Sequence, residues 1–216
     1  MKFFSCDFVH GNVIFNFRGR ALNDFGPFGS GYHEAGKLLM RKMECAVGYR
    51  DFEGYPILFL YRQALELYMK AIIYKGSQLH LLIRDEELDT RRFLKKHRLT
   101  ALLPPIDTVF EVLKWKWDFD VEGAESFERF TELIKEVEAL DRDSSCFRYP
   151  VDKRGEASVP KHFVVNVIKF GRTLDPVLEL LSGLVCALER QWDEMAEAMY
   201  IEQERRRRHR ASDNSA

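Results

Sequence analysis

The feature that most constrains this chain is the segment from Tyr55 to Lys75, which is apolar on nearly every side. Its apolar residues are Ile57, Leu58, Phe59, Leu60, Tyr61, Leu65, Leu67, Met69, Ile72 and Ile73. Pro56 suits the first turn of a helix, and Gly76 suits the position after its last turn. Because a helix that is apolar all round has to be buried, the sequence predicts a central helix against which other elements pack.

Helical periodicity recurs in several other segments. Apolar residues repeat at helical spacing over 33–48, 109–117 and 127–140, with Ser126 as a capping residue, and again from Asp175-Pro176 to Met195. The charged segment 84–97 is also expected to be helical. Several helices with short connections are typical of an all-α helical bundle.

The remaining segments predict smaller features. Residues 3–18 alternate in polarity around a Gly11-Asn12 turn, which predicts a β-hairpin, and 23–31 is rich in glycine and reads as a loop. Residues 163–165 suggest a short strand, and 141–160 look irregular. We therefore divide the chain into a hairpin appendage (1–31), a helical domain (32–200) and a basic tail (201–216) that we expect to be disordered.

Composition excludes several classes of protein. Lys and Arg total 33 and Asp and Glu total 34, which removes the simple electrostatic case for a strong nucleic-acid binder and leaves only a local basic patch open. The four cysteines lie far apart, without zinc-ligand spacing. We expect reduced thiols, no metal, no cofactor and a cytoplasmic protein. The sequence has no signal-peptide core and no apolar run long enough for a membrane span.

Three charged residues interrupt the apolar helix. Arg62, Glu66 and Lys70 are spaced four apart, so they share one narrow face. One interpretation is a surface ladder of ion pairs, each contributing roughly 0.2–0.5 kcal/mol. The other is a functional groove, because desolvated charges need partners or a ligand.

His97 lies in a basic setting, after Lys95 and Lys96 and before Arg98. Such surroundings favour the neutral imidazole and place it near an anionic ligand. Arg92 precedes His97 with four residues between them. The alternative is that His97 is a helix cap or a packed polar residue.

The segment 143–155 joins two helices and carries Arg148, Tyr149 and Asp152 beside Pro150 and Gly155. An irregular segment with both charge and aromatic rings is typical of a binding loop. The alternative is a solvated connector whose Phe147 and Tyr149 fill the edge of the core.

Three elements together resemble the HEPN superfamily, and within it a group of bacterial HEPN-like proteins. They are the helix from Tyr55 to Ile73 with its Arg, Glu and Lys, the run His97-Arg98-Leu99, and the run Phe147-Arg148-Tyr149-Pro150. The resemblance covers residues 33–190. It implies a helical bundle, often paired as a homodimer.

Many proteins of that superfamily are metal-independent ribonucleases of toxin–antitoxin, antiviral or RNA-processing systems. Their signature, an arginine and a histidine with four to six residues between them, is matched by Arg92 and His97. The resemblance implies that the histidine acts as a general base or acid toward a ribose 2′-hydroxyl, while arginine neutralises the phosphate.

The first hypothesis is thus an RNA-directed module, in its most specific form a metal-independent ribonuclease of a bacterial toxin or defence system, with an antitoxin or another protein as partner. The alternative is a non-catalytic module that binds a nucleotide or a protein. The candidate catalytic residues are His97, Arg62 and Arg148, with Arg92 as the alternative arginine. The candidate binding residues are Glu66, Lys70, Tyr149 and Asp152.

Overall fold

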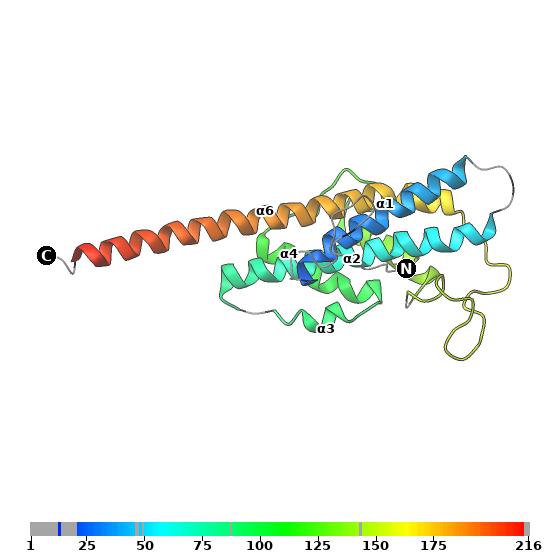
Figure 1. Ribbon diagram of the computed structural model, residues 1–216, viewed down its shortest axis with the longest axis horizontal. Coiled ribbons are helices and arrows are strands. Elements are labelled where there is room, and N and C mark those ends of the chain that lie inside the picture. The colour runs from blue at the N-terminus through cyan, green and yellow to red at the C-terminus, as the bar shows by residue number, and fades with distance from the viewer. Residues whose placement is uncertain are drawn as a thin grey trace, which may run out of the picture.

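The computed structural model describes Val13 and residues 21–45, 48, 50–86, 88–142 and 144–213, and it consists of packed helices (Figure 1). The helices are α1 (Phe25–Glu44), α2 (Asp51–Arg84), α3 (Arg91–Leu94), α4 (Leu103–Leu113), α5 (Phe127–Leu140) and α6 (Val167–Asp213), with the 3-10 turns η1 (Ala21–Asp24) and η2 (Leu99–Leu102). Within these ranges there is no strand, only an isolated bridge between Val151 and Ala157. The all-α class is confirmed, and the hairpin predicted over 3–18 falls outside the described residues apart from Val13.

The central position of α2 is confirmed. It packs along α1 and α6 and also against α4. Its apolar side chains form the middle of the core, and Ile57, Tyr61, Leu65, Met69 and Ile72 have no exposed surface or almost none. The central helix α2, which carries Arg62, Glu66 and Lys70, is therefore held in place on several sides by the core.

The prediction that the helix ends at Gly76 is wrong, because α2 continues to Arg84. The glycine is needed for packing: a Cβ atom at this position would lie 2.3 Å and 2.5 Å from the two methyl groups of Val109. Gly76 thus allows α4 to approach α2 more closely than a larger residue would.

The glycine-rich segment 23–31 was predicted to be a loop, and this prediction is wrong. The segment forms the end of η1 and the first turns of α1. Its glycines are spaced so that they face the other helices. A Cβ at Gly26 would touch Val185, one at Gly29 would touch Tyr68, and each contact would be 3.1 Å. The glycines that suggested a loop instead allow neighbouring helices to pack closely against α1.

The last helix begins earlier than the Asp175-Pro176 pair suggested. It starts at Val167, with the Asn166 side chain accepting a hydrogen bond from the backbone N–H of Lys169 at 2.9 Å. Asp175 then lies inside α6, where its Oδ1 is 2.9 Å from His33 Nε2 and accepts a hydrogen bond from the Tyr61 hydroxyl at 2.8 Å. Burial and this carboxylate raise the pKa of Tyr61. The two polar contacts join α1, α2 and α6.

Three further predicted segments differ from the structure. After Arg84, the last residue of α2, the segment to 97 is helical only over α3, and 163–165 does not form a strand. The helix expected to reach Trp117 ends at Leu113, because Lys114 adopts a left-handed conformation (φ 56°) and turns the chain back so that Trp115 and Trp117 pack on Phe110.

The C-terminal half of α6 leaves the bundle and projects from it as a single helix (Figure 1). We had expected the end of the chain to be disordered, yet the helix runs to Asp213. The sequence after Gly183 lacks Gly and Pro through Asp213 and is rich in Glu, Arg, Ala and Met, which favour a helix. No helix in the described part of the chain is both long and apolar enough to span a membrane.

The contact between Gly76 and Val109 predicts opposite effects for two glycine-to-alanine substitutions. Gly76→Ala should destabilise the fold by about 1–3 kcal/mol, because the added methyl group has to displace Val109. Gly183→Ala is the matched control: no atom lies within 4 Å of its Cβ position, so helix propensity alone should stabilise the fold by up to about 1 kcal/mol. Urea unfolding measures both, and equal effects would contradict the packing role of Gly76.

Candidate functional site

The carboxylate of Glu66 is the centre of a buried cluster of charged side chains on α2. Its Oε1 accepts a hydrogen bond from Lys70 Nζ at 2.8 Å, and its Oε2 accepts one from Arg62 Nη1 at 2.8 Å. The side chains of Arg62 and Glu66 are each 1% exposed, and that of Lys70 is also buried. The surface-ladder interpretation is therefore wrong, although the predicted i,i+4 pairs are present.

Arg62 connects this cluster to two loops. Its Nε donates to the carbonyl oxygen of Asp141 at 2.8 Å, and its Nη2 donates to the carbonyl oxygens of His97 and, at 3.5 Å, Arg142. One guanidinium thus fixes the loop after α3 and the loop after α5 side by side. Because the group is buried and occupied by protein acceptors, a ligand cannot reach it directly.

His97 lies at the boundary between this cluster and solvent. Its Nδ1 is 3.0 Å from Glu66 Oε1, while its side chain is 60% exposed. An ionised carboxylate can only accept hydrogen bonds, so this contact assigns the proton to Nδ1 and leaves the lone pair of the neutral ring on Nε2. The buried cluster therefore orients an accessible imidazole.

The charges of the buried cluster balance. Arg62 and Lys70 are cations, and Glu66 and Asp141 are the matching carboxylates. Burial alone would raise the pKa of Glu66, but the neighbouring Lys70 and Arg62 outweigh it, and the pKa of Glu66 lies below its usual range. Glu66 is therefore ionised at neutral pH, as the hydrogen bond from His97 requires.

Asp141 holds the loop that follows α5. Its Oδ1 accepts the backbone N–H groups of Ser145 at 2.9 Å and Cys146 at 3.1 Å. Its Oδ2 is buried, lies 3.9 Å from Arg62 Nε and has no hydrogen-bond partner among the described residues. The charge of Arg62 is what compensates this oxygen.

A cationic depression is formed by residues around η2 and the end of α5. A cavity of about 430 Å³ is lined by Arg98, Thr100, Lys135, Glu138, Ala139 and Arg142. Arg98 is paired with Glu138 at 3.2 Å, whereas Lys135 and Arg142 are exposed and form no ion pair with any described residue. Arg98 follows His97 in the chain, and the Arg62 guanidinium donates to the backbone carbonyl oxygens of both His97 and Arg142. The imidazole and the depression therefore belong to the same two loops that Arg62 ties together.

Glu138 stabilises the wall of this depression. Its carboxylate accepts hydrogen bonds from the backbone N–H of Thr100 at 2.8 Å, from the Thr100 hydroxyl and from Arg98. Burial would raise the pKa of Glu138, but these donors outweigh it and lower the pKa. The ionised Glu138 therefore connects η2 to α5 and fixes the backbone of residues 98–100, which follow His97.

The predicted binding loop has a mixed outcome. Arg148 is exposed, with its guanidinium carbon 5.7 Å from the centre of the Phe59 ring and 5.8 Å from that of Tyr149. Tyr149 is 60% exposed. Asp152 instead closes a turn, because its Oδ1 accepts the backbone N–H groups of Arg154 and Glu156. Between these described residues and His97, no hydrogen bond or ion pair is formed.

Arg92, the alternative arginine, lies elsewhere. Its guanidinium carbon is 4.6 Å from the centre of the Phe93 ring, and it lines a separate cavity that includes Ile73. Ile73 is about two helical turns beyond Glu66, or roughly 10 Å along the axis. The structure brings Arg62 and His97 together and gives Arg92 a different environment.

Asp141, Lys135 and Arg142 did not emerge from the sequence analysis. Asp141 and Arg142 follow directly after the apolar stripe of α5, and an Asp-Arg pair at a helix end was the available signal. Lys135 lies on the solvent face of an amphipathic helix, where a lysine is ordinary.

Comparisons with protein-family models, with curated proteins and with solved structures found no match to this chain. The HEPN resemblance therefore remains an expectation based on the three sequence elements.

Replacing the central carboxylate should destabilise the fold in a pH-dependent manner. Glu66→Gln leaves Arg62 and Lys70 with one balancing carboxylate, and breaking such a buried network costs about 3–5 kcal/mol at neutral pH. Because the pKa of Glu66 is lowered from 4.5 in the fold, its contribution is fully present above that pH and is lost as pH falls through the lower folded value. Urea unfolding from neutral to acidic pH measures this.

The difference between wild type and Glu66→Gln should therefore shrink on acidification. Glu132→Gln is the matched control, since Glu132 pairs with Arg129 at 2.9 Å on the surface and should change stability by less than about 1 kcal/mol. A deficit for Glu66→Gln that is the same at all pH values would contradict the role of the ionised carboxylate.

Proposed function

We propose that this chain is an RNA-directed module that cleaves RNA without a metal ion, with His97 as its general base. The observation that supports this is the hydrogen bond between the exposed imidazole of His97 and the buried carboxylate of Glu66. A carboxylate that fixes the tautomer and orientation of an accessible histidine is a recurring arrangement in acid–base catalysis.

In the proposed reaction, Nε2 of His97 takes the proton of a ribose 2′-hydroxyl. The 2′-oxygen then attacks the adjacent phosphorus, the bond to the 5′-oxygen breaks, and the leaving 5′-oxygen takes a proton from water; the proton held by His97 is later released to solvent. The products are a 2′,3′-cyclic phosphate and a 5′-hydroxyl. Charge on the phosphate grows during this step, and we assign its stabilisation to Arg142 and Lys135, the accessible cations of the depression.

Arg62, Glu66 and Lys70 act as positioning residues in this proposal. They are buried, so they do not contact RNA. Arg62 instead holds the backbones of His97 and Arg142 next to each other. Arg148 and Tyr149 provide an exposed cation beside an exposed ring, which is suited to a nucleotide further along the strand.

The second candidate is a module that binds the same ligand without cleaving it. One observation favours it: Arg62, expected to help neutralise a phosphate, is buried and occupied by Glu66 inside the protein, as Lys70 is. This leaves a small set of accessible cations, which is sufficient for binding but sparse for transition-state stabilisation.

Cleavage is tested with the full chain, single-stranded RNA and EDTA, and with analysis of the new ends for a 2′,3′-cyclic phosphate. His97→Asn should lower the rate by about 10²–10⁴, because the general base is lost. His162→Asn is the matched control: His162 is also exposed, and asparagine tolerates its left-handed backbone (φ 60°). Circular dichroism checks that both variants fold.

Wild-type cleavage that His97→Asn retains would exclude His97 as the base. An absence of cleavage in wild type, with RNA binding intact, would overturn the catalytic proposal for the RNAs tested and support the binding module.

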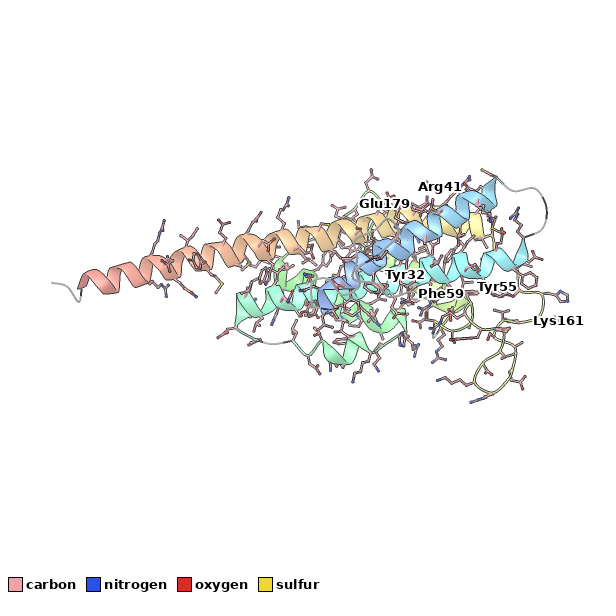
Figure 2. The ribbon with its side chains drawn as sticks, viewed as in Figure 1. Tyr32, Arg41, Tyr55, Phe59, Lys161 and Glu179 are labelled. Atoms are coloured by element: carbon pink, nitrogen blue, oxygen red, sulfur yellow. The ribbon has the colours of Figure 1, made fainter. Side chains whose placement is uncertain are left out.

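RNA binding should depend on the cationic depression. Arg142→Gln and Lys135→Gln should each weaken binding across sequences and each lower the slope of log K against log salt by about 1, because one phosphate contact is lost. Lys161→Gln is the control, since Lys161 points to solvent from a loop remote from the bundle axis (Figure 2). Fluorescence anisotropy at several salt concentrations measures this, and equal slopes for all three variants would rule out the depression as the RNA site.

A further inference from the structure

The segment between α4 and α5 contains a straight stretch of chain that belongs to no helix. Residues 115–119 form neither a turn nor a bend, and none of them has a positive φ angle. Half-buried and exposed side chains alternate there in the order Trp115, Lys116, Trp117, Asp118, Phe119 and Asp120. Because burial that alternates with a period of two is typical of a β-strand, this stretch has the form of a single strand.

The aromatic side of this stretch is fixed by the core. The ring of Trp117 lies 4.8 Å from the rings of Phe110 and Phe130, measured between ring centres. Its indole N–H donates to the carbonyl oxygen of Ala124 at 2.9 Å, and Phe119 lies edge-on to it at 5.4 Å. The backbone is thus held in place before a partner binds, so little conformational freedom is lost on binding.

The backbone of this stretch has unused hydrogen-bonding groups. The N–H of Trp115 donates to the carbonyl oxygen of Phe110 at 2.9 Å, whereas no backbone N–H or carbonyl oxygen over 116–120 bonds to any described residue. Consecutive residues of a strand direct these groups to opposite edges. Since Trp115 directs its own toward α4, those of Lys116 and Asp118 point away from α4. Unpaired groups along an edge are a template for another strand.

The exposed side chains of this edge carry a pattern of charge. Lys116 is followed by Asp118 and Asp120 on the same face, and in the described part of the chain none of the three forms an ion pair. Opposite charges facing each other across two strands stabilise the pair. In the antiparallel orientation, which is the more stable per residue, a complementary partner reads basic, apolar, basic, apolar, acidic from its amino end. Its apolar residues then cover the exposed parts of the aromatic rings.

We propose that residues 116–120 bind an extended segment of another protein, which adds to this edge as an antiparallel strand. The backbone groups of Lys116 and Asp118 supply the hydrogen bonds, and the exposed charges select the partner. This division between backbone affinity and side-chain specificity is usual where a peptide adds a strand to an edge. None of these residues belongs to the site assigned to RNA, so the inference does not rest on the proposed function.

The first test uses the full chain and a synthetic peptide with capped ends, Lys-Val-Lys-Val-Glu-Val, whose residues face Asp120 to Trp115 in that order. Isothermal titration calorimetry should detect binding. N-methylation of the second lysine and the glutamate removes the two N–H groups directed at the edge and should weaken binding about tenfold or more. N-methylation of the first two valines is the matched control, because their N–H groups point away from the edge, and it should leave the affinity unchanged.

The second test exchanges two charges on the chain. Lys116→Glu with Asp118→Lys changes exposed side chains only, so circular dichroism should be unchanged. The variant should bind the first peptide about fivefold more weakly or worse, and should prefer Lys-Val-Glu-Val-Lys-Val. Lys153→Glu with Asp193→Lys exchanges the same two charge types at exposed positions outside this edge and should keep the wild-type preference.

Three outcomes would overturn the inference. The first is that folded wild type does not bind the peptide at concentrations up to about 1 mM, the range of weak binding. The second is that both methylation patterns weaken binding equally, because the edge of Lys116 and Asp118 would then not be used. The third concerns hydrogen–deuterium exchange over 115–120, which the peptide should slow. Slowing by single-stranded RNA and not by the peptide would assign the aromatic stretch to nucleotide bases.

Discussion

The hydrogen-bonded ion pairs around the Glu66 carboxylate are the interaction on which the candidate site depends. Glu66 balances two cations on its own helix and holds the ring of His97. Buried ion pairs stabilise a fold weakly, since apolar residues of similar volume often do as well. What this cluster provides is position: Arg62 donates to the carbonyl oxygens of His97 and Arg142 and so ties the backbones of both loops to α2.

The sequence predicted those parts of the structure that follow from local pattern. The apolar segment around Leu65 had to be buried, and Ser126 had to begin a helix, where its hydroxyl accepts the backbone N–H of Arg129. The stripe of Arg62, Glu66 and Lys70 was visible because charge on so apolar a helix is exceptional. Its proximity to His97 depends on the path of the chain between them, which periodicity does not encode.

The elements that sequence reasoning misassigned have a common physical cause. Glycine near Gly26 and Gly29, and again at Gly76, has two meanings, a flexible turn or a site of close packing, and only the neighbouring helix decides between them. Asp175 likewise could cap a helix or contact a polar side chain of another helix. The contact with His33 on α1 shows that the second role is the one it has. Asp141 was missed because its partner Arg62 is 79 residues away in sequence. In each case the deciding atom belongs to a segment distant in the chain.

The nearly balanced composition of this chain follows from where its charges lie. Two cations and two carboxylates are enclosed in the Glu66 cluster. Together they add nothing to the net charge, although each is a strong charge locally. A total near zero is therefore compatible with accessible cations at Lys135 and Arg142. Screening confines the effect of such exposed cations to about one Debye length, roughly 8 Å at physiological salt, so a near-zero total says little about the field at one depression of the surface.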